Sequence, residues 1–184
     1  MRELGTVSLT SERLVLRRFV HEDAVSMYQN WANDDEVTRY LTWPSHENLA
    51  VSEQLLKLWV ERYQLTTTYS WAICLKTDIS QPIGSIALGK LDKGLESMEV
   101  GYALGQAWWR KGYTSEAFAC IIQFAFKEIG INRLVGHHVL DNPNSGLVMK
   151  KCGMQYEGKI REGGFDNQGQ RVDLQQYSLL ASDV

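Results

Sequence analysis

The segment from Thr114 to Ile129 constrains the fold of this chain more than any other. Its apolar residues surround a helix nearly completely: Ala117, Phe118, Ile121, Ile122, Phe124 and Ala125. A helix that is apolar on all sides has to be buried by other elements, and Gly130 is placed to end it. We therefore expect a central helix packed against a sheet.

Strand patterns lie on both sides of this helix. Period-two alternation or short apolar runs predict strands over residues 13–19, 69–75, 83–91, 98–104, 132–140, 154–161 and 171–180, with a turn from Asp78 to Pro82. Helical patterns cover residues 21–28, 34–40, 47–63 and 145–151. Because helices and strands alternate in the second half, we expect a mixed sheet with helices on both faces.

Composition narrows the class of protein. The 184 residues contain no internal repeat and no linker-like stretch, which favours one domain spanning residues 1–184. With 19 Lys+Arg against 22 Asp+Glu, the chain gives no reason to expect DNA as its partner. No window reaches the roughly 18 apolar residues of a membrane span, and the N-terminal residues lack the apolar stretch of a leader. Three unpaired cysteines fit a reducing compartment, and no zinc spacing is found, so we expect a cytoplasmic protein without a metal.

Residues 106–117 are the segment that most suggests chemistry. They connect a strand to the buried helix, and the N-terminus of a helix presents unpaired N–H groups that suit a phosphate. Gly112 permits close approach of an anion, Arg110 and Lys111 add positive charge, and Thr114 or Ser115 is placed to cap the helix. An ordinary strand-to-helix turn with solvated basic residues explains the same pattern equally well. GxxxxGK[ST] and GxGxxG are absent, which disfavours a Walker-type NTPase and a dinucleotide-binding turn.

Longer strings carry a family resemblance. WWRKGYTSEA, preceded by EVGYALG and followed by LDNPNSGLVMKKCGMQYEG, resembles the GNAT N-acetyltransferase superfamily, and more narrowly its RimJ/RimL branch of ribosomal-protein alanine acetyltransferases. RLVLRRF and RVDLQQYSLL also match that branch, so the similarity covers essentially the whole chain. The resemblance implies an α/β (α+β) fold with a single mixed, mostly antiparallel, splayed sheet. It also implies acetyl-coenzyme A as acetyl donor, an amine as acceptor, and a possible homodimer.

The resemblance assigns donor-binding roles by motif position. The pyrophosphate is expected on the loop formed by Trp109, Arg110, Lys111, Gly112, Tyr113, Thr114 and Ser115. The family often has Gly at the position of Arg110 and Gly or Ala at that of Thr114. The pantetheine arm is expected on backbone groups of Tyr102, Ala103 and Leu104, as an added strand would lie. Asn142 and Lys151 are further donor contacts, whereas Asn144 fits a capping role.

Direct transfer in a ternary complex is the simpler mechanism, because no covalent intermediate is required. A primary amine is protonated at neutral pH, so a base has to accept a proton. Glu99 is the first candidate, with a pKa raised by burial beside Tyr102, and Glu162 is the reserve. A backbone N–H near Tyr102 would stabilise the oxyanion, and Ser145 would donate to the thioester sulfur.

The acceptor is left open. A protein N-terminal amine and a small amine such as a polyamine both fit, and the candidate contacts are Trp31, Tyr40, Trp43 and the acidic residues 34–36. The latter also fit a simple helix N-terminus. A non-catalytic acyl-coenzyme A-binding module and an unrelated phosphate-binding enzyme are the alternative functions. A Cys120 or Cys152 acyl carrier would require ping-pong kinetics.

Overall fold

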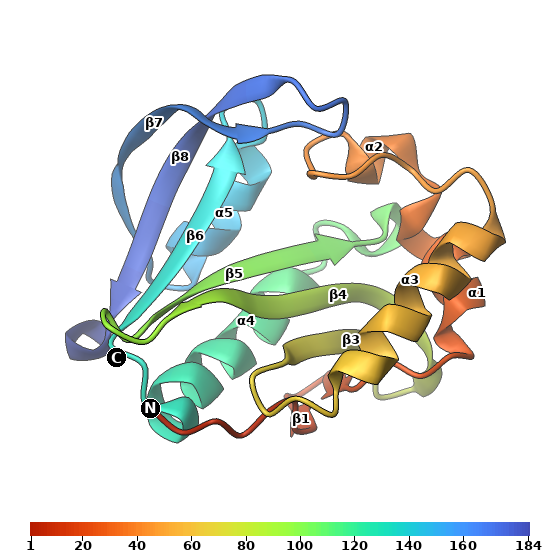
Figure 1. The fold of residues 1–184 in the computed structure, drawn as a ribbon, viewed down its shortest axis with the longest axis horizontal. Helices are drawn as coiled ribbons and strands as arrows, with labels where there is room; N and C mark the ends of the chain where they lie inside the picture. The colour runs from red at the N-terminus through yellow and green to blue at the C-terminus, as the bar shows by residue number, and fades with distance from the viewer.

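A single sheet runs through the molecule in the order β1-β2-β3-β4-β5-β6-β8-β7 (Figure 1). The computed structural model describes residues 1–184. The strands are β1 (Leu9–Thr10), β2 (Leu14–Arg17), β3 (Tyr69–Leu75), β4 (Asp78–Asp92), β5 (Ser97–Leu104), β6 (Arg133–Val139), β7 (Gln155–Phe165) and β8 (Arg171–Leu180). Every neighbouring pair is antiparallel except β5 and β6, which are parallel. The mixed, mostly antiparallel sheet expected from the sequence is confirmed.

Helices cover both faces of the sheet, as expected. They are α1 (Asp23–Met27), α2 (Asp35–Thr38), α3 (Leu49–Arg62), α4 (Tyr113–Gln123) and α5 (Pro143–Lys151). π-Helical turns extend α1 to Ala32 and α4 to Ile129, and Gly130 ends the second with a φ of 79°. In Figure 1, α1 and α3 lie in front of the strands, whereas α4 and α5 lie behind them. None of these helices is long and apolar enough to cross a membrane.

Period-two alternation along the strands divides the interior into two cores. Trp71 and Ile73 face α4, where Phe118 and Ile121 are fully buried as the apolar helix pattern predicted. Ala72 and Cys74 face the other way, toward the smaller core around Leu56 of α3. Burial of α4 between the sheet and α5 fixes the position of its N-terminus, which residues 106–112 precede.

The sheet splits in its middle. β5 and β6 share only four residue pairs, from Ser97↔Arg133 to Val100↔Gly136. Beyond them β5 stays paired with β4 as far as Leu104, while β6 stays paired with β8 as far as Val139. Figure 1 shows the two strands diverging from this point. The molecule therefore consists of two sheet arms joined by a short parallel ladder, with a gap between them.

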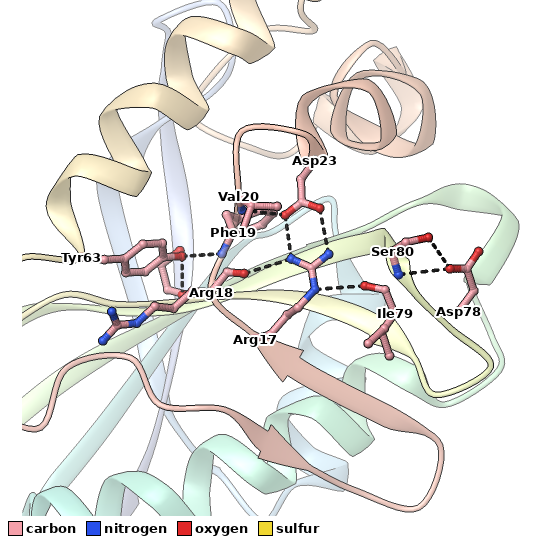
Figure 2. Close-up of polar contacts among 10 residues, drawn as sticks. Arg17, Arg18, Phe19, Val20, Asp23, Tyr63, Asp78, Ile79 and Ser80 are labelled. Atoms are coloured by element: carbon pink, nitrogen blue, oxygen red, sulfur yellow. Dashed lines mark hydrogen bonds and ion pairs between the residues drawn. The ribbon is translucent and has the colours of Figure 1, made fainter.

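A buried ion pair ties the N-terminal segment to the sheet (Figure 2). Both terminal nitrogens of Arg17 bind the carboxylate of Asp23, at 2.7 and 2.8 Å, and the Asp23 side chain is only 1% exposed. Tyr63 is the residue that follows α3. Its hydroxyl accepts a hydrogen bond from the Phe19 N–H and donates one to the Ser70 carbonyl. These contacts hold α1 and α3 over the β3–β4 hairpin.

The expected turn at 78–82 is wrong. Leu75 pairs directly with Asp78, so the chain reverses at residues 76–77 and β4 begins four residues before Pro82. Pro82 instead faces Cys74 at an irregularity in the ladder, where two register shifts occur. Proline is tolerated at such a bulge because its missing N–H interrupts regular pairing there anyway.

Candidate functional site

The loop before α4 presents a run of free backbone amides. The N–H groups of residues 110–115 donate no hydrogen bond within the protein, and the first helical bond runs from Glu116 N–H to the Gly112 carbonyl. Arg110 and Gly112 both have left-handed backbone conformations, with φ of 60° and 81°. Successive amides turned inward in this way form a concave nest for an anion, and the partial positive charge of the helix adds to it.

No side chain closes this helix end. Gly112 is the N-cap residue, so the expected cap by Thr114 or Ser115 is wrong: both lie within the first turn of α4. Both residues are only partly buried, which leaves their amides accessible. The left-handed conformation at Arg110 fits the glycine that the resemblance implies at this position, because a side chain at positive φ is strained.

Contacts outside the loop hold it in shape. The Trp109 indole N–H donates to the Leu104 carbonyl at 2.7 Å, and Lys111 Nζ donates to the Ala107 carbonyl at 2.8 Å. Arg13 of the segment before β2 binds the Glu116 carboxylate and donates to the Lys111 carbonyl. Sequence patterns did not indicate this role for Arg13, because its position in RLVLRRF is that of an ordinary strand residue.

The edge of β5 is open beside the loop. Gly105 N–H donates to the Ile83 carbonyl on β4. Backbone groups alternate in direction along a strand, so those of Ala103 also face β4, whereas those of Tyr102 and Leu104 face the gap. The expected use of the Ala103 backbone toward a ligand in the gap is therefore wrong. Because Trp109 occupies the Leu104 carbonyl, Tyr102 offers the first complete unpaired backbone site beyond the ladder.

The N-terminus of α5 meets β5 across the gap. The Tyr102 hydroxyl lies 2.8 Å from Ser145 Oγ and 3.1 Å from the Ser145 carbonyl oxygen. Burial raises the pKa of the Tyr102 phenol, so this hydroxyl stays protonated. The Asn142 side chain accepts from the Ser145 N–H and caps α5, which begins at Pro143 rather than at Ser145. Its amide nitrogen remains available to a ligand, so capping and ligand binding are compatible.

The C-terminus of α5 lies beside the donor loop. Cys152, which follows α5, places its sulfur 3.6 Å from the Ser115 carbonyl oxygen. The preceding residue, Lys151, is exposed. Burial raises the pKa of the Cys152 thiol to about 11 and also raises that of Cys120. Neither thiol is therefore ionised at neutral pH, which disfavours an acyl-carrier role.

Glu99 lies on the other face of the sheet. Met98 and Val100 pack in the α4 core, so alternation directs Glu99 to the opposite side from Tyr102. Its carboxylate binds Lys90 Nζ at 2.9 Å and His137 Nδ1 at 3.2 Å. Burial acts to raise its pKa, but the hydrogen bonds and positive charge of these two partners outweigh burial and lower it. The expected raised pKa and the aromatic wall at Tyr102 are both wrong.

A pocket of about 600 Å³ opens between α2 and the β7–β8 hairpin. Figure 1 shows the hairpin tip reaching toward α2. The charged residues lining it are Arg39, Asp141, Glu162, Asp166, Arg171 and Asp173. Four carboxylates against two guanidinium groups favour a cation. Glu162 itself sits in a left-handed conformation with a φ of 47°, held by its N–H bond to Asp173 Oδ1.

The other expected acceptor contacts separate into two groups. Tyr40 lines the pocket, next to Arg39. Trp31 is fully buried in the smaller core, and Trp43 packs against that core and against His46. Asp34 caps α2 through the Glu36 N–H, so the acidic residues 34–36 form a helix N-terminus.

Comparison with known proteins identifies the family. Residues 13–155 match the family model described as an acetyltransferase (GNAT) domain. The chain is 28% identical over 172 residues to an uncharacterized N-acetyltransferase, YoaA, of Bacillus subtilis, covering 94% of this chain and 96% of YoaA. It is 23% identical to the [ribosomal protein uS5]-alanine N-acetyltransferase of Escherichia coli, covering 85% of this chain and 82% of that enzyme.

A solved structure shares the fold. The microcin C7 self-immunity acetyltransferase MccE, solved in complex with acetyl-CoA and AMP, superposes with a TM-score of 0.80 at 22% identity, covering 92% of this chain and 93% of that one.

Proposed function

The chain belongs to the GNAT acetyltransferase family and is an N-acetyltransferase, and from this premise we propose that it transfers the acetyl group of acetyl-coenzyme A to a cationic primary amine. The observation that carries the donor half is the run of free amides at residues 110–115, directly beside the open edge of β5. The observation that carries the acceptor half is the acidic pocket at the β7–β8 hairpin.

The residues present fit the donor. Amides 110–115 would bind its pyrophosphate, with Arg110, Lys111 and Lys151 supplying charge. The Tyr102 backbone and the Leu104 N–H would bind the pantetheine arm, and Asn142 would add a side-chain contact. The donor supplies an acetyl group activated as a thioester. The complex of the related fold MccE with acetyl-CoA supports this assignment.

In the proposed mechanism, two groups of this chain would stabilise the charge that develops during transfer. The Tyr102 N–H, unpaired on the gap side, is placed to donate to a carbonyl oxygen that becomes negative. Ser145 Oγ, oriented by the Tyr102 hydroxyl at 2.8 Å, is placed to donate to a departing sulfur. Direct transfer needs no covalent intermediate on the enzyme.

The geometry favours Glu162 over Glu99 as the base. Glu162 lines the acidic pocket, and its carboxylate is 3.9 Å from its nearest cation, Arg171. Glu99 is held by Lys90 and His137 in direct contact, and its lowered pKa makes the carboxylate a poor proton acceptor. We assign Glu162 to accept the proton of the acceptor ammonium, and Glu99 to a separate role described below.

The acceptor class is tested by a substrate screen. Acetyl-coenzyme A is incubated with peptides that differ in their N-terminal residue, with polyamines and with uncharged amide controls, and thiol release is followed together with product mass. Acetylation of cationic primary amines is expected. Control peptides that lack lysine and carry an acetylated N-terminus have no primary amine and are expected to stay unmodified. Coenzyme A binding without turnover on any amine would contradict the proposal.

A further inference from the structure

A continuous chain of polar side chains crosses the open face of the sheet. Glu99 of β5 binds His137 of β6, and His137 Nε2 lies 2.8 Å from Gln176 Oε1 of β8. Gln176 Nε2 donates to a Glu157 oxygen on β7 at 2.6 Å. Arg133 and the Ser178 hydroxyl bind the same Glu157 carboxylate. The chain thus links four strands and spans the point where the two sheet arms separate.

The hydrogen-bond directions in this chain determine the protonation of His137. Glu157 is paired with Arg133, which lowers its pKa to about 2, so it only accepts. Gln176 must therefore turn its NH₂ group to Glu157 and its carbonyl oxygen to His137. His137 Nε2 then has to carry a proton. Nδ1 lies 3.2 Å from the Glu99 carboxylate, and this contact becomes an ion pair when Nδ1 is protonated as well.

His137 lies on β6 at the point where the two sheet arms separate. The last parallel pair is Val100↔Gly136, so His137 is the first residue of β6 beyond the ladder. The point where β5 and β6 separate is called the vertex here. The contact between His137 and Glu99 crosses the vertex on one face of the sheet, and the contact between Tyr102 and Ser145 crosses it on the other face. The parallel ladder between β5 and β6 supplies only four residue pairs, so a side-chain bridge at its end restricts the angle between the two arms.

We propose that His137 is a positioning residue for donor binding. As an imidazolium held between Glu99 and Gln176, it fixes the separation of the two sheet arms at the value that the pantetheine segment of acetyl-coenzyme A requires. We name the contact between Glu99 and His137 the vertex clasp. This inference rests on the proposed function, because it assigns the gap between β5 and β6 to acetyl-coenzyme A.

The charges around His137 set the pH range of the clasp. The facing groups are Lys90 from β4, Glu99 from β5, Arg133 from β6 and Glu157 from β7, while β8 presents the uncharged Gln176. The hydrogen bond that His137 donates to Glu99 raises the pKa of His137 above 6.5, against burial and the charge of Lys90. The stabilisation by His137 is therefore complete below its unfolded pKa and is lost as pH rises through the raised, folded value.

The test measures coenzyme A affinity by calorimetry as a function of pH, without any acceptor. In the wild type the Kd is expected to rise about tenfold as His137 loses its proton, and His137→Gln is expected to show that weaker affinity at every pH. His21→Gln, which removes an exposed histidine, is the matched control and should behave as the wild type. Thermal unfolding of each variant confirms that it is folded.

A second readout uses the wild type alone. ¹⁵N NMR of the imidazole at pH 7 is expected to show both nitrogens of His137 protonated. A neutral ring, or a His137→Gln variant with wild-type affinity and pH profile, would overturn the clasp while leaving the acetyltransferase proposal intact. Failure of the wild type to bind coenzyme A at any pH would overturn both.

Discussion

The hydroxyl of Tyr102 and the hydroxyl of Ser145 lie 2.8 Å apart, and this contact joins the free end of β5 to the N-terminus of α5. The contact spans the gap in which we propose that acetyl-coenzyme A binds. Ser145, which we assign to donate to the thioester sulfur, is therefore oriented by β5, the strand proposed to bind the pantetheine arm. The same tyrosine contributes the first free backbone site beyond the ladder. One residue therefore couples positioning of the donor to positioning of the group that acts on it.

Replacing Ser145 with alanine tests that coupling. Ser145→Ala is expected to lower kcat about tenfold, the worth of one hydrogen bond to a developing charge, with little change in coenzyme A affinity. Asn144→Ala, at the exposed neighbouring position, serves as the control. Steady-state kinetics separate kcat from KM, and an unchanged kcat would contradict the role of Ser145.

Exchange of Gly112 tests the donor loop. Gly112→Val places a β-branched side chain at a φ of 81°, and it is expected to weaken coenzyme A binding at least tenfold because the nest is distorted. Gly130→Val introduces comparable backbone strain at the other end of the same apolar segment, where φ is 79°. Calorimetry should therefore show weakened binding in the first variant only, and equal losses in both would indicate general destabilisation.

The assignment of the base is tested by two carboxamide variants. Glu162→Gln is expected to lower kcat about a hundredfold near neutral pH, with a smaller loss at high pH where the amine is already deprotonated. Glu99→Gln is expected to act mainly on coenzyme A affinity, through the vertex clasp. A pH–rate profile in which Glu99→Gln alone shows the kcat loss would reverse the assignment.

The Arg17–Asp23 pair is expected to dominate the stability of the N-terminal region. Asp23→Ala leaves Arg17 largely buried without its partner and should lower the free energy of unfolding by about 3–5 kcal/mol. Glu128→Ala removes a carboxylate from the exposed pair with Arg2 and should cost about 1 kcal/mol or less. Urea denaturation measures both, and similar losses would contradict this view of Arg17.

Acid stability should depend on Glu157. Its folded pKa of about 2 is lower than the ordinary value of 4.5, so it contributes stability above 4.5 that is lost as pH falls toward 2. Glu157→Gln is therefore expected to be less stable than the wild type at neutral pH and to lose less stability on acidification. Melting temperatures across this range check the slope, and parallel curves would exclude the contribution.

Local signals in the sequence predicted much of the fold. The all-round apolar pattern placed the buried helix within one residue of its start, because burial on every side leaves little alternative. The strand at 69–75 and the strand at 171–180 have the bounds that alternation indicated. The turn at 78–82 failed because Pro82 signals a break, and a bulge accommodates it within β4 as well as a turn would.

Side-chain contacts that depend on strand pairing could not be predicted from the sequence. His137 and Glu99 meet because Val100 pairs with Gly136 in a parallel ladder, and nothing local to either residue specifies that register. Arg13 reaches Glu116 for the same kind of reason, since β2 and α4 are brought together only by the packed core. The donor loop was predictable because its function rests on consecutive backbone amides, which a short motif encodes.

Amide NMR of the labelled protein during titration with coenzyme A tests the donor site. The largest shifts are expected on the amides of residues 110–115 and on the Tyr102 amide, because those groups are free in the protein alone. Shifts confined to other elements, with these amides unmoved at saturation, would contradict the proposed donor site and the acetyl transfer built on it.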